Sequence, residues 1–182
     1  SAREDYDGWT RQGNPGWDAD LVVPMLDWVH ESFRVRRYHT EELTSAQKAF
    51  VEAGVRTGLP WADDLDDVAA GPGIGPMPVN IVDGVRWNAA FAFLDPVRRL
   101  DRLTIAGNRP VRRIVFDGTR AVGVEVTDGT VVRAHRIVVA GGAYHSPAIL
   151  QRSGVGAADA LRAVGVTPVL DLPGVGENLL DH

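Results

Sequence analysis

The chain has 182 residues, of which 45% are hydrophobic and 24% are charged, and its formal net charge is −5. This composition is typical of a soluble globular protein, and the negative charge argues against binding of nucleic acid or anionic membranes as its main function. The absence of cysteine excludes disulfides, thiolate catalysis and zinc–thiolate sites. No apolar run approaches the roughly 20 residues that a membrane span requires, and we expect a cytoplasmic protein.

The N-terminal stretch is polar and then becomes helical. Residues 1–20 contain Trp9, Trp17 and a Gly- and Pro-rich turn signal, so we expect an ordered loop in which the tryptophans find packing partners. Apolar residues at helical spacing predict a helix over residues 21–30.

Two further helices are predicted before residue 100. A capping box that begins at Thr44 predicts a helix that buries Phe50 and ends at Gly58. Residues 59–78 are rich in Asp, Gly and Pro and are expected to be loop. Aromatic residues at near-helical spacing predict the second helix over residues 84–94.

From residue 103 the pattern changes to short strands rich in β-branched residues. Turn pairs such as Asp117–Gly118 and Asp128–Gly129 separate them, which indicates an antiparallel meander. The change of composition near residue 100 predicts a domain boundary. The predicted strands are residues 103–106, 111–116, 121–127 and 130–135.

The last eighty residues also contain a pattern of strand, helix, helix and strand. A continuous apolar run at residues 137–140 predicts a strand buried on both faces of a parallel sheet. Ser146 is expected to cap a helix whose first position is Pro147. A second helix over residues 157–164 should lead to another apolar strand over residues 166–170.

The pair Gly141–Gly142, directly after the apolar run, is the best local candidate for a binding site. Glycines there let a ligand or a second backbone approach closely, and the helix that follows would direct its positive end to an anion. A tight turn that only serves packing explains the same residues, and both interpretations stay open.

Other polar clusters favour structural interpretations. The five histidines form no pair at metal-ligand spacing, and no metal site is predicted. The acidic run at residues 63–67 lacks the spaced oxygens of a calcium loop and is expected to be solvated. Arg34, Arg36 and Arg37 are expected to form a solvent-exposed basic patch. No nucleophile–base–acid triad can be assembled, so no catalytic residue is assigned.

As one pattern, residues 142–156 resemble the second signature of the glucose–methanol–choline (GMC) flavoprotein oxidoreductases. The match includes Ser146–Pro147, two aliphatic residues, and a Ser-Gly-aliphatic-Gly ending. Residues 84–96, 121–124 and 172–182 resemble further family elements in the expected order. Choline- and alcohol-dehydrogenase-like bacterial members look most similar.

The resemblance implies an α/β fold: part of a Rossmann-like FAD-binding domain with a β-meander, joined to part of the GMC substrate domain. On this basis residues 1–20 are expected to be a loop associated with the FAD domain. Residues 21–100 would be a partial substrate, or cap, region. Residues 101–182 would be a partial FAD-binding domain with the meander, the buried strand and the helices.

The resemblance also implies a cofactor strip and an activity. The backbone of Val111 is expected beside the FAD adenine, and Ala140, Gly141 and Gly142 near the adenosine–diphosphate portion. Family members oxidise an alcohol by hydride transfer to the flavin N5, with a histidine as base. Because the phosphate-binding fingerprint and that histidine are not in this sequence, we expect the chain alone to be inactive and not to retain FAD.

A hypothesis of another class remains open. The chain would then be a stand-alone binding or scaffold module derived from the family, or one piece of a split enzyme. The expected partner of the parent enzyme is a small-molecule alcohol. If the strand at residues 137–140 lacks neighbouring strands, its apolar surface would be exposed, which predicts self-association.

Overall fold

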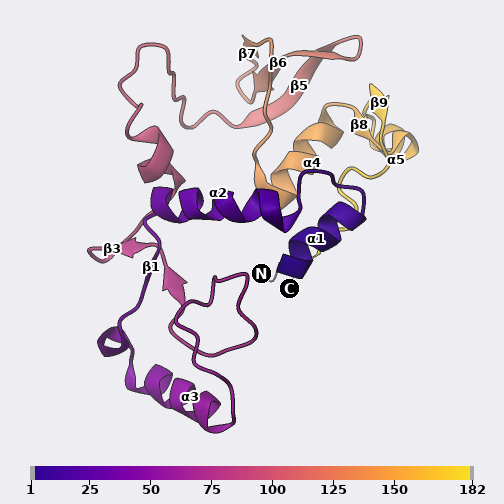
Figure 1. Cartoon of the computed structure of the whole chain (residues 1–182). Coiled ribbons are helices and arrows are strands. Elements are labelled where there is room, and N and C mark those ends of the chain that lie inside the picture. The colour runs from indigo at the N-terminus through magenta and orange to yellow at the C-terminus, as the bar shows by residue number, and fades with distance from the viewer. Residues whose placement is uncertain (1–2, 181–182) are drawn as a thin grey trace. The chain divides into compact units, whose positions relative to one another are not determined.

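The computed structural model describes residues 3–180 and has the expected mixed α/β character (Figure 1). The chain divides into two compact units: unit 1 ends at Thr104 and unit 2 begins at Ile105. No helix between residues 3 and 180 combines the length and the apolar character that crossing a bilayer would need.

Unit 1 opens with a helix, α1 (Arg3–Arg11), where a loop was predicted. Acidic Glu4 in the first turn and basic Arg11 in the last complement the helix dipole, and the two side chains form an ion pair. The rings of Tyr6 and Trp9 meet edge-on with centroids 5.4 Å apart. Local charge placement and aromatic packing therefore form a helix that the turn signal further along the chain did not predict.

The next helix confirms the prediction made from apolar spacing and extends it at both ends. It is α2 (Ala19–Ser32), and it begins where the Asp18 carboxylate accepts a hydrogen bond from the Leu21 N–H at 3.2 Å. A short strand, β1 (Arg36–Arg37), follows and pairs antiparallel with β2 (Pro78–Val79).

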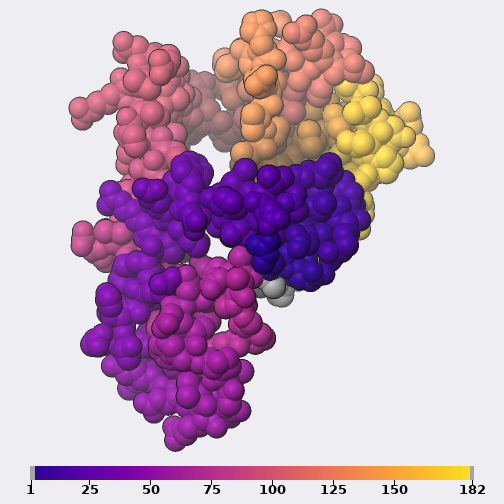
Figure 2. Space-filling model, in the orientation of Figure 1, coloured from indigo at the N-terminus to yellow at the C-terminus, as the bar shows by residue number. Residues whose placement is uncertain are grey.

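The predicted capping box is present at the start of α3 (Ser45–Arg56). The Gln47 N–H donates to Thr44 Oγ1 at 3.3 Å, and the Thr44 N–H donates back to Gln47 Oε1 at 2.8 Å. The expected burial of Phe50 is wrong, because this side chain is 72% exposed. Instead α3 packs against the loop that follows it (Figure 2). Gly54 is at this contact, where an added Cβ would lie 2.2 Å from the Ile74 side chain.

The helix predicted over residues 84–94 is only partly present. Strands β3 (Ile81–Val82) and β4 (Val85–Arg86) form a hairpin through Asp83 and Gly84. Both turn residues have positive φ, 50° and 75°, as a type I′ turn requires. A π-helix, Ala90–Leu94, then replaces the second part of the predicted helix.

Unit 2 contains the predicted meander. Strands β5 (Val111–Asp117), β6 (Arg120–Val126) and β7 (Val131–Arg133) form an antiparallel sheet in the order β5–β6–β7. At its centre, a Cβ on Gly123 would lie 2.6 Å from the Val132 carbonyl oxygen, so only glycine fits. The strand predicted at residues 103–106 is absent.

The apolar run at residues 137–140 does not form a strand, so this prediction is wrong. Val138 is 82% exposed, and within residues 3–180 no neighbouring strand pairs with the run. A buried strand of a parallel sheet needs neighbouring strands to satisfy its backbone N–H and C=O groups, and no such neighbour is among the described elements. The predicted self-association through this surface stays a prediction.

Helix α4 (Gly142–Arg152) starts four residues before the predicted cap. Pro147 is inside it, and Ser146 does not cap its own helix start but accepts a hydrogen bond from the Gly141 N–H at 3.0 Å. The second helix is confirmed as α5 (Ala158–Ala163). The final predicted strand is reduced to β9 (Leu170–Asp171), which pairs in parallel with β8 (Val155–Gly156).

One buried hydrogen bond fixes α4 on the meander. The N–H of Ile114, which is 5% exposed, points away from β6 and donates to Ser153 Oγ at 2.7 Å. Ser153 Oγ donates in turn to the Ile149 carbonyl at 2.5 Å. The serine hydroxyl therefore satisfies an amide at the outer edge of β5 that its partner strand cannot reach.

The substitution Ser153→Ala is expected to destabilise unit 2 by about 1–3 kcal/mol, because it leaves the buried Ile114 N–H without an acceptor. Ser146→Ala in the same helix is the matched control: its hydroxyl serves an exposed N–H that water can solvate, so the change should stay within about 0.5 kcal/mol. Urea unfolding followed through β5 and β6 amide signals measures both. Equal unfolding free energies for the two variants would contradict this role.

In unit 1 a bidentate ion pair anchors the 3-10 helix Thr40–Glu42. Arg36 Nη1 and Nη2 each donate to a Glu42 carboxylate oxygen at 2.8 Å, and the His39 N–H donates to the same carboxylate at 2.8 Å. These bonds, chiefly those from Arg36, lower the pKa of Glu42 from 4.5 to about 2.

Because this pKa is lowered on folding, the Glu42 carboxylate contributes stability above pH 4.5 and loses it as the pH falls toward 2. We expect the carbon-13 shift of Glu42 Cδ to titrate near pH 2. In Arg36→Met the midpoint should return toward 4.5, whereas Arg56→Met, which removes a separate ion pair, should leave it unchanged. A Glu42 midpoint near 4.5 in the unmodified chain would refute the assignment.

Candidate functional site

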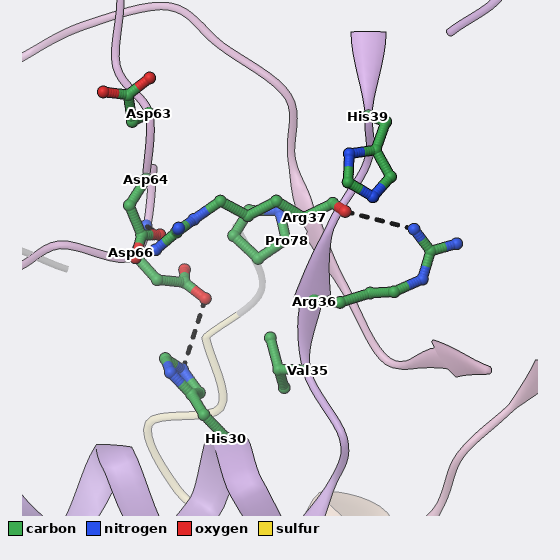
Figure 3. Close-up of a pocket in the computed structure, with 9 residues that line it drawn as sticks. All are labelled: His30, Val35, Arg36, Arg37, His39, Asp63, Asp64, Asp66 and Pro78. Atoms are coloured by element: carbon green, nitrogen blue, oxygen red, sulfur yellow. Dashed lines mark hydrogen bonds and ion pairs between the residues drawn. The ribbon is translucent and has the colours of Figure 1, made fainter. Parts of the chain in front are cut away.

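A cavity of about 610 Å³ opens in unit 1 between the end of α2, strand β1 and the loop that precedes β2 (Figure 3). Its lining is predominantly charged, with two arginines, three aspartates and two histidines. The lining residues are His30, Val35, Arg36, Arg37, His39, Asp63, Asp64, Asp66 and Pro78.

Two interactions connect β1 and α2 to the acidic loop at this cavity. The Arg37 side chain extends to Asp64 and forms an ion pair with it, which lowers the pKa of Asp64 and raises that of Arg37 (Figure 3). His30 Nε2 lies 3.5 Å from Asp66 Oδ2. The basic patch and the acidic run, predicted as two separate solvated features, therefore meet in one cluster.

The charged lining of this cavity is suited to binding and not to nucleophilic catalysis. Its arginines are engaged by carboxylates, and the lining residues include no serine, cysteine or lysine nucleophile. Across residues 3–180, no group of three or more His, Asp or Glu side chains could hold a metal ion. The cavity suits a small polar molecule.

The predicted cofactor residues all lie in unit 2. Ala140, Gly141 and Gly142 form an exposed turn that leads into α4. Gly142 has φ +77°, a conformation that favours glycine, and an added Cβ would meet nothing within 4 Å. The turn thus presents bare backbone at the electropositive end of an 11-residue helix.

Val111 begins β5 at a β-bulge. Val111 pairs with Val126 and Arg113 with Glu125, so Arg112 is the extra residue. Such a bulge interrupts the regular ladder and leaves peptide groups available for other partners.

Strand β5 and helix α4 run alongside each other (Figure 1). Arg152 Nε donates to the Arg112 carbonyl at 2.9 Å, and Ser153 accepts from Ile114 one residue later on the helix. Both contacts join the first half of β5 to the C-terminal end of α4, whereas the glycine turn lies at the N-terminal end of the same helix.

Sequence reasoning missed three residues of this arrangement. Ser153 was recognised as part of a motif but was given no role, and Arg152 and Glu125 were not singled out. The available signal was an Arg-Arg pair on one predicted strand with a lone glutamate on the strand paired to it. The cavity in unit 1 was missed because its charges come from segments far apart in sequence.

The sequence model of the GMC oxidoreductase family matches residues 1–182. Choline dehydrogenase of Homo sapiens, a mitochondrial protein, is 38% identical over 196 residues, which cover 98% of this chain and 32% of that protein. Oxygen-dependent choline dehydrogenase of Pseudomonas syringae pv. tomato is 37% identical over 200 residues, which cover 98% of this chain and 35% of that protein.

Solved structures agree with the sequence relatives. Pyridoxine 4-oxidase from Mesorbium loti superposes with a TM-score of 0.81 at 29% identity, over 94% of this chain and 37% of that one. A FAD-dependent oxidoreductase from Chaetomium thermophilum gives a TM-score of 0.77 at 26% identity, over 95% of this chain and 35% of that one. The chain spans about a third of the length of the curated relatives that it matches.

The predicted fold class and the predicted family are thus confirmed by the family match, the relatives and the solved structures. Because the family model covers all of its residues, this chain belongs to the GMC oxidoreductase family.

Proposed function

We propose that this chain is the central part of a FAD-dependent enzyme that oxidises the CH–OH group of a small alcohol. Family membership and the relatives named as dehydrogenases and oxidases support an oxidoreductase. The observation that carries the proposal is the exposed Gly141–Gly142 turn at the start of α4, where an added Cβ on Gly142 would meet nothing within 4 Å. The same unit contains the β-bulge next to Val111.

The relatives' names suggest the substrate class. Two of them are choline dehydrogenases, so choline or a similar cationic alcohol is the first candidate substrate. FAD, when bound, supplies the two-electron acceptor for the hydride of the alcohol.

The residues of unit 2 are compatible with the adenosine diphosphate half of FAD. The backbone of Val111 would lie beside the adenine, and Ala140, Gly141 and Gly142 would lie near the diphosphate. The absence of a side chain at Gly142, where an added Cβ would meet nothing within 4 Å, would let an anionic group approach the N-terminal end of α4, where the helix dipole favours it. The chain's own contribution is therefore binding and orientation.

Titration of the chain with ADP is expected to shift the amide signals of Val111 and of residues 140–142. Gly142→Asp places a carboxylate next to the diphosphate and should weaken ADP about tenfold, which corresponds to about 1.4 kcal/mol. Gly165→Asp is the matched control, because Gly165 has the same φ of +77° and equally open surroundings but follows α5. Equal ADP affinity in the two variants would show that the turn does not bind the diphosphate.

The purified 182-residue chain is expected to carry no reducible flavin and to leave choline unoxidised. The product of an uninterrupted reading frame that contains this chain should bind FAD and lose its flavin absorbance when it is mixed anaerobically with choline. A reducible flavin bound tightly to the chain alone would overturn the first expectation. A reading frame limited to this chain would support the alternative of a scaffold module or one piece of a split enzyme.

A further inference from the structure

The β-bulge at the start of β5 is held in place through its side chains. Arg112 Nη1 donates to Glu125 Oε1 at 2.6 Å, and Arg113 Nε donates to Glu125 Oε2 at 2.7 Å. Neighbouring residues on a regular strand point to opposite faces, so one carboxylate can receive both arginines only because the bulge turns them to the same side.

The burial of this cluster is uneven. The Glu125 side chain is 9% exposed, whereas those of Arg112 and Arg113 are 62% and 49% exposed. The hydrogen bond from Arg113, more than any other contact, lowers the pKa of Glu125. The carboxylate thus stays charged and keeps both guanidinium groups over the bulge.

Helix α4 holds the same bulge through its backbone. The extra residue Arg112 has no cross-strand partner, and its carbonyl accepts the hydrogen bond from Arg152 Nε at 2.9 Å. Two residues later, the Ile114 N–H donates to Ser153 Oγ. The bulge is therefore fixed from β6 by a carboxylate and from α4 by a guanidinium.

We propose that Arg152 and Glu125 are positioning residues that set the distance and orientation between the two halves of the adenosine diphosphate site. This inference rests on the proposed function. One rigid helix of 11 residues, about 16 Å long, carries the glycine turn at its first residue and Arg152 at its last. Arg152 fixes the peptide group next to Val111, and Glu125 prevents the bulge from relaxing into regular pairing, which would turn Val111 to the other face.

The experiment compares Arg152→Met and Glu125→Gln with Arg162→Met in the same chain. The control removes a guanidinium from α5 that pairs with the exposed Asp159. Amide hydrogen exchange without ligand measures how often the bulge at residues 111–113 opens. ADP titration followed by amide chemical shifts measures the binding affinity. Arg152→Lys tests whether a shorter cation can restore the bond to the Arg112 carbonyl.

Both test variants are expected to raise amide exchange at residues 111–113 about tenfold or more, with β7 amides unchanged, and to weaken ADP about tenfold. Arg152→Lys should recover part of the affinity, and Arg162→Met should change neither measurement. Confinement of the faster exchange to the bulge separates positioning from a general loss of stability, which would raise exchange throughout the sheet.

The inference is overturned if Arg152→Met binds ADP within twofold of the unmodified chain while that chain shows ADP shifts at Val111. It is also overturned if exchange at residues 111–113 does not change. If the unmodified chain shows no ADP shifts at Val111 or the glycine turn, the proposed contact of these residues with the adenosine diphosphate fails instead, and the role of Arg152 in the site fails with it.

Discussion

The hydrogen bond from the Ile114 N–H to Ser153 Oγ is the contact on which the rest of unit 2 depends. An amide at the outer edge of β5 cannot be left buried and unsatisfied, and a serine at the end of α4 supplies the acceptor. Next to Ser153, Arg152 reaches the Arg112 carbonyl, so the C-terminal end of α4 is attached to β5 at two points. The binding strip that we propose is thus positioned by the far end of its own helix.

The glycine that follows Ser153 is part of the same constraint. Gly154 has φ +90°, and an added Cβ would lie 2.6 Å from the Thr167 carbonyl oxygen. The Gly154 carbonyl accepts the N–H groups of Val169 and Leu170, which brings β9 beside β8. Ser153 attaches α4 to the meander, and the next residue, Gly154, leaves room for the segment at Thr167.

In unit 1, charge pairs join β1 to other segments of the chain. Arg36 and Arg37 are neighbours on β1, and each engages a carboxylate from a different segment, Glu42 or Asp64. Such pairs orient the surrounding chain more than they stabilise it, because exposed ion pairs contribute little free energy. They place charged groups around the cavity, and the acidic run that was predicted to be solvated supplies one wall of it.

The sequence by itself determined the family, the meander and the capped helix α3, because signature residues, Asp-Gly turns and capping boxes act within a few positions. The hairpin at Asp83–Gly84 contains the same Asp-Gly turn signal and was predictable in principle, although the spacing of aromatic residues favoured a helix there. Tertiary structure alone decided that residues 137–140 stay unpaired, that Arg37 meets Asp64, and that Arg152 fixes the bulge beside Val111. Each of these outcomes depends on partners that lie more than twenty residues away or outside the described elements, and no local pattern encodes such partners.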